Sequence, residues 1–219
     1  MQEKEEVGNR TYNRESVEFS RVLAFTDGLF AIAMTLLIVA VTVPNISDEN
    51  SVHDLADGLN DLTPDFTSFF ISFAVIGRYW LAHHLFISLL ARMDQGFIGL
   101  NLIYLAFIAF LPFPTALLGE YFNNPLTIVI YAVSVGIVSG MEVVLLRHAY
   151  RRDLLQNKPT PEVYRFGVIA SLTPVFFFAL SIPIAFVSTI LAVVVWFLTA
   201  PFGGWLQRRA PEGAESLFG

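Results

Sequence analysis

Long apolar blocks separated by short polar segments dominate the chain. The last 42 residues of apolar sequence, Phe166 to Gln207, contain no charge, and as a helix they would be about 63 Å long, enough for two crossings of a roughly 30 Å hydrocarbon core. We place the turn between these crossings near Ser181-Ile182-Pro183. The pattern predicts an all-α membrane protein with six transmembrane helices, at about residues 22–43, 62–82, 95–119, 125–146, 166–181 and 184–206.

The segments around these helices divide into two sides. All 13 Lys and Arg residues fall on or next to one side of a six-span arrangement, which the positive-inside rule assigns to the cytoplasm together with both termini. Residues 1–20 are then a solvated cytoplasmic arm, 21–207 the six-span domain and 208–219 a cytoplasmic tail. The opposite side carries seven acids and no base: Asp48, Glu49, Asp54, Asp57, Asp61, Asp65 and Glu120.

This anionic side has two interpretations. A one-sided acidic vestibule would concentrate cations and repel anions. Acidic residues would also simply keep translocated loops soluble. The sequence leaves both open.

Composition narrows the function classes. With 55% hydrophobic and 15% charged residues, the chain is outside the range of soluble enzymes and of disordered proteins. It has no cysteine, and no HExxH, GxSxG or Walker motif, so we expect no catalytic residues, no metal site and no cofactor. A net charge of −6, with bases scattered at membrane boundaries, gives no support for nucleic-acid binding. The K⁺-filter sequence TVGYG is absent.

Ionisable side chains inside the apolar blocks are the strongest candidates for function. Asp27 lies within the first block, where a charge is costly unless it meets a partner or water. Counting along the helices brings Arg78, His83, His84, Asp94 and Asn101 to the same depth. We therefore expect a polar cluster that joins helices one, two and three near the cytoplasm, acting as a packing network, a proton or ion relay, or a gating latch.

The first block also has an apolar stripe. Ile32, Leu36 and Val39 are spaced i, i+4 and i+7, with Thr35 beside them. They could line a pore, although a helix that is apolar all round gives such a stripe on any face. Glu142, in the fourth block, is a second intramembrane acid, for which Arg147 or His148 would have to reach back.

A resemblance adds to this interpretation. The stretch RVLAFTDGLFAIAMTLL at residues 21–37 resembles the first helix of the transmembrane protein 175 family of potassium channels, whose mark is Arg-x-x-x-Phe-Ser-Asp, with Thr26 in place of the serine. WLAHHLF at 80–86 and FIAFLPFPTALLGEY at 107–121 resemble its prokaryotic branch. The strong resemblance covers about residues 18–122.

The resemblance implies a homotetramer around a central pore lined by helix one. It places the pore constriction at Ile32, further apolar rings at Leu36 and Val39, and a hydroxyl layer linked with potassium preference at Thr35. The permeant ion would be K⁺, with other monovalent cations passing less well, and the site of action the lipid bilayer of a prokaryotic inner membrane.

The resemblance also implies a set of residues that supports helix one. The family's Arg and Asp correspond to Arg21 and Asp27, and their neighbours in the network would be Thr26, Trp80, His83, Asp94 and Asn101. An ion-coupled secondary transporter stays open as an alternative, although spans one to three do not match spans four to six as transporter repeats usually do. A non-conducting membrane scaffold is the third possibility.

Overall fold

The computed structural model describes residues 10–214, and these are mostly helical. Six helical segments are long and apolar enough to cross a membrane, which confirms the predicted fold class. The elements in chain order are β1 (Thr11–Asn13), α1 (Val17–Val39), α2 (Val52–Asp61), α3 (Thr63–Ser88), β2 (Arg92–Asp94), α4 (Gln95–Phe110), α5 (Pro112–Glu120), α6 (Pro125–Arg151), α7 (Pro161–Ala185), α8 (Thr189–Phe197) and α9 (Thr199–Gln207). Segments α4–α5 and α8–α9 are each one span in two parts.

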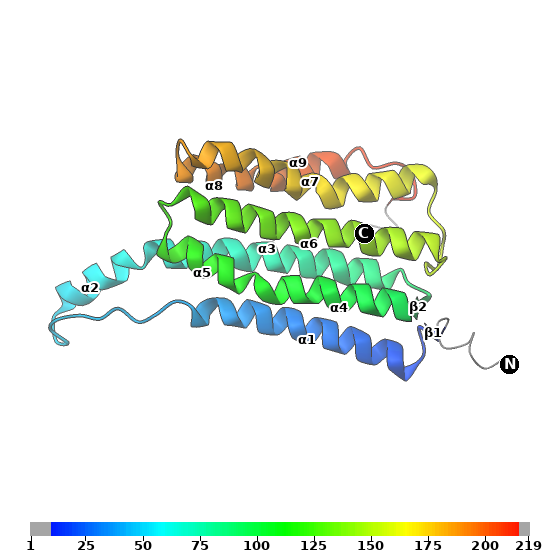
Figure 1. Cartoon of the computed structure of the whole chain (residues 1–219), viewed down its shortest axis with the longest axis horizontal. Coiled ribbons are helices and arrows are strands. Elements are labelled where there is room, and N and C mark those ends of the chain that lie inside the picture. The colour runs from blue at the N-terminus through cyan, green and yellow to red at the C-terminus, as the bar shows by residue number, and fades with distance from the viewer. Residues whose placement is uncertain (1–9, 215–219) are drawn as a thin grey trace.

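The spans lie side by side in layers (Figure 1). Helix α1 forms one edge of the bundle and packs against α3, α4 and α5, while α7, α8 and α9 lie at the opposite edge. Helices α3 and α6 lie between these edges. The short acidic helix α2 projects from one end of the bundle, and the two strands lie at the other end. Helix α1 therefore has neighbours on one side only within this chain.

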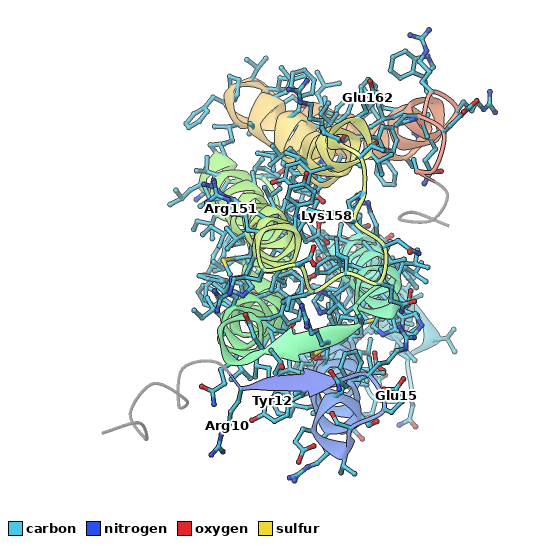
Figure 2. The ribbon with its side chains drawn as sticks, turned by 90° about the vertical axis from the view of Figure 1, so that its right-hand side faces the viewer. Arg10, Tyr12, Glu15, Arg151, Lys158 and Glu162 are labelled. Carbon is cyan, nitrogen blue, oxygen red and sulfur yellow. The ribbon has the colours of Figure 1, made fainter. Side chains whose placement is uncertain are left out.

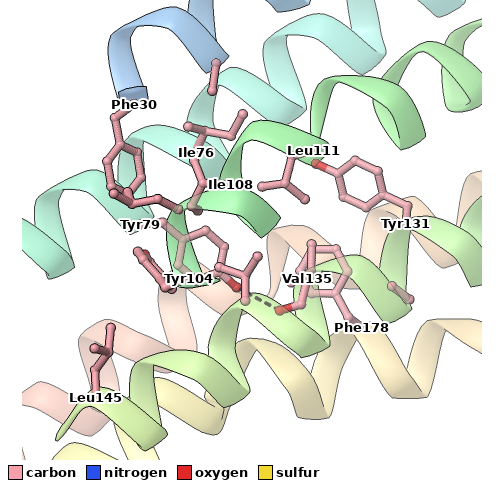
Figure 3. Close-up of a cluster of buried hydrophobic side chains, with 14 of the residues drawn as sticks. Phe30, Ile76, Tyr79, Tyr104, Ile108, Leu111, Tyr131, Val135, Leu145 and Phe178 are labelled. Atoms are coloured by element: carbon pink, nitrogen blue, oxygen red, sulfur yellow. Dashed lines mark hydrogen bonds between the residues drawn. The ribbon is translucent and has the colours of Figure 1, made fainter. Parts of the chain in front are cut away.

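The core is built on large aromatic side chains, some of which have a hydrogen-bonded hydroxyl. Phe30, Tyr79, Tyr104 and Tyr131 are almost completely buried (Figure 3). The Tyr79 hydroxyl bonds Ser139 Oγ at 2.6 Å and donates to the Val135 carbonyl at 3.3 Å. Such bonds join α3 to α6, because an unpaired polar group in an apolar interior costs several kcal/mol, on the order of 2–7.

Two of the spans contain a break, and one helix is longer than predicted. The third span breaks at Leu111, because Pro112 and Pro114 have no N–H to donate back along the helix. The Leu111 N–H bonds the Ile108 carbonyl, three residues back, at 3.1 Å. The last span breaks at Leu198. Helix α3 runs on to Ser88, well past the predicted end at 82.

The predicted turn at Ser181-Ile182-Pro183 is wrong. Helix α7 continues to Ala185 with Pro174 and Pro183 inside it, and α8 begins after the N-cap Ser188. The Ser181 hydroxyl has a role in helix packing instead. It donates to the Phe178 carbonyl at 2.6 Å and accepts a bond from Trp196 Nε1 at 2.8 Å, which ties α7 to α8.

The prediction that residues 1–20 form a solvated arm is also wrong in part. Strand β1 pairs antiparallel with β2, with Thr11 opposite Asp94, and the Arg14 side chain bonds the Ser88 and Leu90 carbonyls. Helix α1 begins at Val17 because Ser16 caps it, accepting a bond from the Phe19 N–H. Residues 1–9 lie outside the described range.

Two buried tyrosines give a matched test of this core. Tyr104 Oη is buried without a hydrogen-bond partner among residues 10–214, whereas the Tyr79 hydroxyl is bonded. We predict that Tyr79→Phe lowers the free energy of unfolding by about 1–2 kcal/mol, because it leaves Ser139 unpaired. Tyr104→Phe should be neutral or stabilising. Thermal unfolding of both variants in detergent checks this, and equal losses would contradict it.

Candidate functional site

Helix α1 has two different faces. One face is buried against its neighbours and carries Phe19, Thr26, Phe30, Ala33 and Leu37. The other face is open. Ile32 is 59% exposed, Leu36 44% and Val39 71%, and Thr35 is exposed beside them. The four residues assigned to a pore therefore share the open face of the edge helix.

The Thr35 hydroxyl forms a hydrogen bond within its own helix. It donates to the Ile32 carbonyl at 2.8 Å, which leaves the oxygen free to accept a further bond.

The buried face of α1 carries two polar anchors near its N-terminal half. Trp80 Nε1 on α3 donates to Asp27 Oδ1 at 3.0 Å. One residue earlier, Asn101 Nδ2 on α4 donates to Thr26 Oγ1 at 3.0 Å, and that hydroxyl donates to the Val22 carbonyl at 2.9 Å. The structure thus brings together four of the predicted network residues, and they fix α1 against α3 and α4.

His83 belongs to the same region but makes aromatic contacts. Its ring stacks on Tyr104 with centroids 4.7 Å apart, and lies 6.0 Å from the Phe30 ring of α1. Its Nε2 atom is buried without a hydrogen-bond partner in the described part of the chain. His83 therefore contacts α1 through Phe30 rather than through Asp27.

Asp94 supports α1 only indirectly. It caps α4 by accepting the Phe97 N–H at 2.7 Å, and it bonds His148 Nε2 at 2.8 Å and Arg152 Nε at 3.1 Å on α6. Burial alone would raise the pKa of this carboxyl, but these three hydrogen bonds outweigh it and hold the pKa below its ordinary value.

The sequence interpretation missed the partners of Asp94. His148 and Arg152 are four residues apart and so lie on one helix face, a spacing that could have indicated a shared anionic partner. The suggestion that His148 reaches Glu142 is consequently wrong. Arg147 does not bond Glu142 either. Within residues 10–214, the two ion pairs that involve α6 and its C-cap go to Asp94.

Arg21 is not joined to this network. It is exposed and makes no hydrogen bond or ion pair with residues 10–214. It lies on the open side of α1 together with Ala24 and Phe25. Among the described residues there is also no group of three or more His, Cys, Asp or Glu side chains that could hold a metal ion.

The two ends of the bundle differ in charge. The end with the two strands carries the bases Arg10, Arg151 and Lys158 together with the acids Glu15 and Glu162 (Figure 2). At the opposite end, α2 carries Asp54, Asp57 and Asp61 and has no buried residue. The structure therefore places these bases at one end, mixed with acids, and the purely acidic helix at the other.

Comparison with known proteins identifies the family of this arrangement. Residues 21–112 match the family model described as "Endosomal/lysosomal potassium channel TMEM175". A potassium channel of Chamaesiphon minutus is 39% identical over 197 residues, which is 85% of this chain and 93% of the relative. The chain belongs to the TMEM175 family. The predicted resemblance is confirmed, and the family is one of ion channels rather than of enzymes.

Solved TMEM175 structures share the fold. The crystal structure of a lysosomal potassium-selective channel TMEM175 homolog from Chamaesiphon minutus matches with a TM-score of 0.71 and 30% identity, over 89% of this chain and 99% of that one. The endosomal/lysosomal proton channel TMEM175 of Homo sapiens is 35% identical over 103 residues, 45% of this chain but 20% of the human protein.

The bond between Trp80 and Asp27 gives a prediction for the TMEM175 fold. Trp80→Phe removes the indole N–H and leaves the Asp27 carboxylate without its donor, so we expect a loss of about 1–3 kcal/mol in the free energy of unfolding. Thermal unfolding in detergent measures it. Trp205→Phe is the matched control, because Trp205 is half-exposed and its indole makes no hydrogen bond with residues 10–214. Equal losses in both variants would refute the role of the bond.

Asp94 gives a prediction with a pH dependence. Asp94→Asn keeps an N-cap and loses the ion pairs, and Asp94→Ala loses both, so the alanine variant should be less stable by about a further 1 kcal/mol. Because the folded pKa of Asp94 lies below the unfolded value of about 4, its carboxylate stabilises the fold above that pH and ceases to do so as the pH falls through the folded pKa.

The stability of the wild type should therefore decline on acidification relative to that of Asp94→Asn. The exposed Asp61→Asn serves as control. Parallel pH profiles for the wild type and Asp94→Asn would show that the ion pairs contribute nothing.

Proposed function

We propose that the protein is a potassium-preferring cation channel that conducts K⁺ down its electrochemical gradient through a central pore lined by α1. The observation that carries this proposal is the position of α1 in the fold. An edge helix with a strongly exposed face is nonetheless anchored by buried polar bonds to α3 and α4. Such bonds fix the rotation of α1, and therefore which of its residues the exposed face presents.

Enclosure of a path requires more than one copy. A single α1 cannot surround an ion, and the chain contains one six-span unit. Closed cyclic symmetry is the usual solution for soluble and membrane oligomers, and the family resemblance supports four copies. We therefore propose a homotetramer in the lipid bilayer, with the four open faces of α1 turned toward the axis.

Ile32 is the proposed constriction of this pore. Rings of Ile32, Leu36 and Val39 would form an apolar passage that closes by dewetting and opens through small movements of α1. Apolar rings cannot replace a complete hydration shell, so selectivity should be weaker than that of a carbonyl filter. The Thr35 hydroxyls would supply the oxygen layer that favours K⁺.

The polar anchors set the orientation of this passage. Trp80, Asn101 and the ring of His83 hold the buried face of α1, and so fix which residues of the opposite face meet the axis. Asp94 would support α1 only indirectly, through the pairing of β2 with β1 and through its bonds to His148 and Arg152. Arg21, on the open side of α1, is placed to contact a neighbouring copy.

The proposed location is the cell membrane, the inner membrane of a prokaryote, with both termini in the cytoplasm. The basic end of the bundle supports this orientation by the positive-inside rule. The acidic helix α2 would then flank the outer mouth and attract cations to it.

Electrical recording of purified protein in planar bilayers tests the proposal. Under opposed K⁺ and Na⁺ gradients the reversal potential of the wild type should shift from zero toward the K⁺ equilibrium potential. Ile32→Asn should increase leak current and reduce the K⁺/Na⁺ permeability ratio several-fold, because a polar ring keeps the constriction hydrated.

Ile38→Asn is the matched control, an exposed isoleucine of the same helix about 120° around the axis from Ile32. It should behave as the wild type. Unchanged selectivity in Ile32→Asn would move the constriction away from Ile32. Uptake that saturates and requires a second ion gradient would make the protein a secondary transporter.

A further inference from the structure

A small internal cavity of about 60 Å³ lies between α3, α6 and α7, away from the open face of α1. Three polar side chains line it: His83 from α3, Glu142 from α6 and Ser171 from α7. The remaining walls are apolar. Both ionisable residues are inside membrane-spanning helices, where polar groups without partners are costly.

Two polar atoms at this cavity lack partners. His83 is 2% exposed and Glu142 9% exposed, and neither His83 Nε2 nor Glu142 Oε1 has a hydrogen-bond partner among residues 10–214. Nine in ten or more buried polar groups in proteins are bonded to protein or to ordered water. By that rule ordered water is the expected partner of these two atoms.

Water fits the cavity in size and in chemistry. One buried water needs about 10–15 Å³ of this volume and two to four polar partners. The cavity exceeds that several-fold, and the imidazole nitrogen, the carboxyl and the Ser171 hydroxyl provide the partners. A short chain of water molecules can bridge His83 to Glu142.

The charges around the pair decide how many protons it holds. Arg78 is the charged side chain whose field reaches Glu142, and no ion pair joins the two. The other polar or titratable groups that face the pair are Tyr79 and His84 on α3 and Asn101 and Tyr104 on α4. A buried site of this kind disfavours net charge, and a carboxyl with an imidazole is neutral overall when the two share a single proton.

We propose that this cavity is a hydrated proton-binding site, in which water links Glu142 to His83 and one proton is shared between them. The site is separate from the α1 passage. It binds a proton from water without any metal or organic ligand, and its occupancy changes the charge directly behind the pore helix.

The His83 ring couples this site to α1. It stacks on Tyr104 and contacts Phe30, which is two residues before Ile32. Loss of the shared proton leaves a negative charge in the cavity and alters the hydrogen bonding of the ring that supports Phe30. This coupling, unlike the proton site itself, rests on the proposed channel function.

Infrared difference spectroscopy of the full-length protein in lipid vesicles tests the proton site without any current. The wild type should show the C=O band of a protonated carboxyl that shifts in D₂O, because water reaches it, and disappears in Glu142→Gln. Glu120→Gln removes an exposed carboxyl at the other end of the bundle and should leave the band unchanged. Identical spectra for the wild type and Glu142→Gln at every pH would overturn the proposal.

A second measurement needs no variant. An experimental map of the wild type that resolves ordered water should show density between His83 Nε2 and Glu142 Oε1, and a dry cavity would overturn the proposal. Current recorded against pH tests the coupling. A pH dependence that is lost in Glu142→Gln supports it, and an unchanged one overturns the coupling while the infrared result still decides the proton site.

Discussion

Inside a membrane, a polar side chain can bond only to protein or to trapped water, and this constraint accounts for the packing of the whole bundle. Individual side-chain bonds join neighbouring spans, among them Trp80 to Asp27, Asn101 to Thr26, Tyr79 to Ser139 and Trp196 to Ser181. Each holds two helices at one rotation, because a small rotation would leave both partners in hydrocarbon without water to replace them. Apolar packing alone does not give such register, since lipid tails are as apolar as leucine.

Polar bonds hold helix α1 in its first half but not in its second. Its first half is held by Thr26 and Asp27, whereas beyond Phe30 the buried face is only Ala33 and Leu37, which pack without polar bonds. The half with the proposed rings is therefore the half with the weaker directional restraint. A helix built in this way can keep its orientation at one end and adjust at the other, which suits a passage that closes by dewetting.

The sequence predicted the features that depend on hydrophobic length and on the placement of charge. Six spans, and one end that carries acids without bases, follow from these alone. The sequence-based prediction failed where a polar residue is explained by a contact that forms only when the helices pack together. Ser181 and Pro183 resemble a turn, but Ser181 is polar because Trp196 needs an acceptor. The partners of Asp94 were missed because His148 and Arg152 reach it across 54 and 58 residues, and no local pattern encodes that distance.

The pairing of β1 with β2 has a mechanical consequence for α1. The strand that precedes the helix is tied to the segment before α4, and Arg14 is bonded to the end of α3, so the Val17 end of α1 is fixed. The bonds of Thr26 and Asp27 extend this fixed part to the middle of the helix. Ile32 lies about 7 Å and Val39 about 18 Å beyond Asp27, so a bend of about 5° at Asp27 would displace them by about 0.7 Å and about 1.6 Å. In the proposed tetramer, four such bends directed toward or away from the axis would change the diameter of the Val39 ring by about 3 Å, roughly the width of a water molecule.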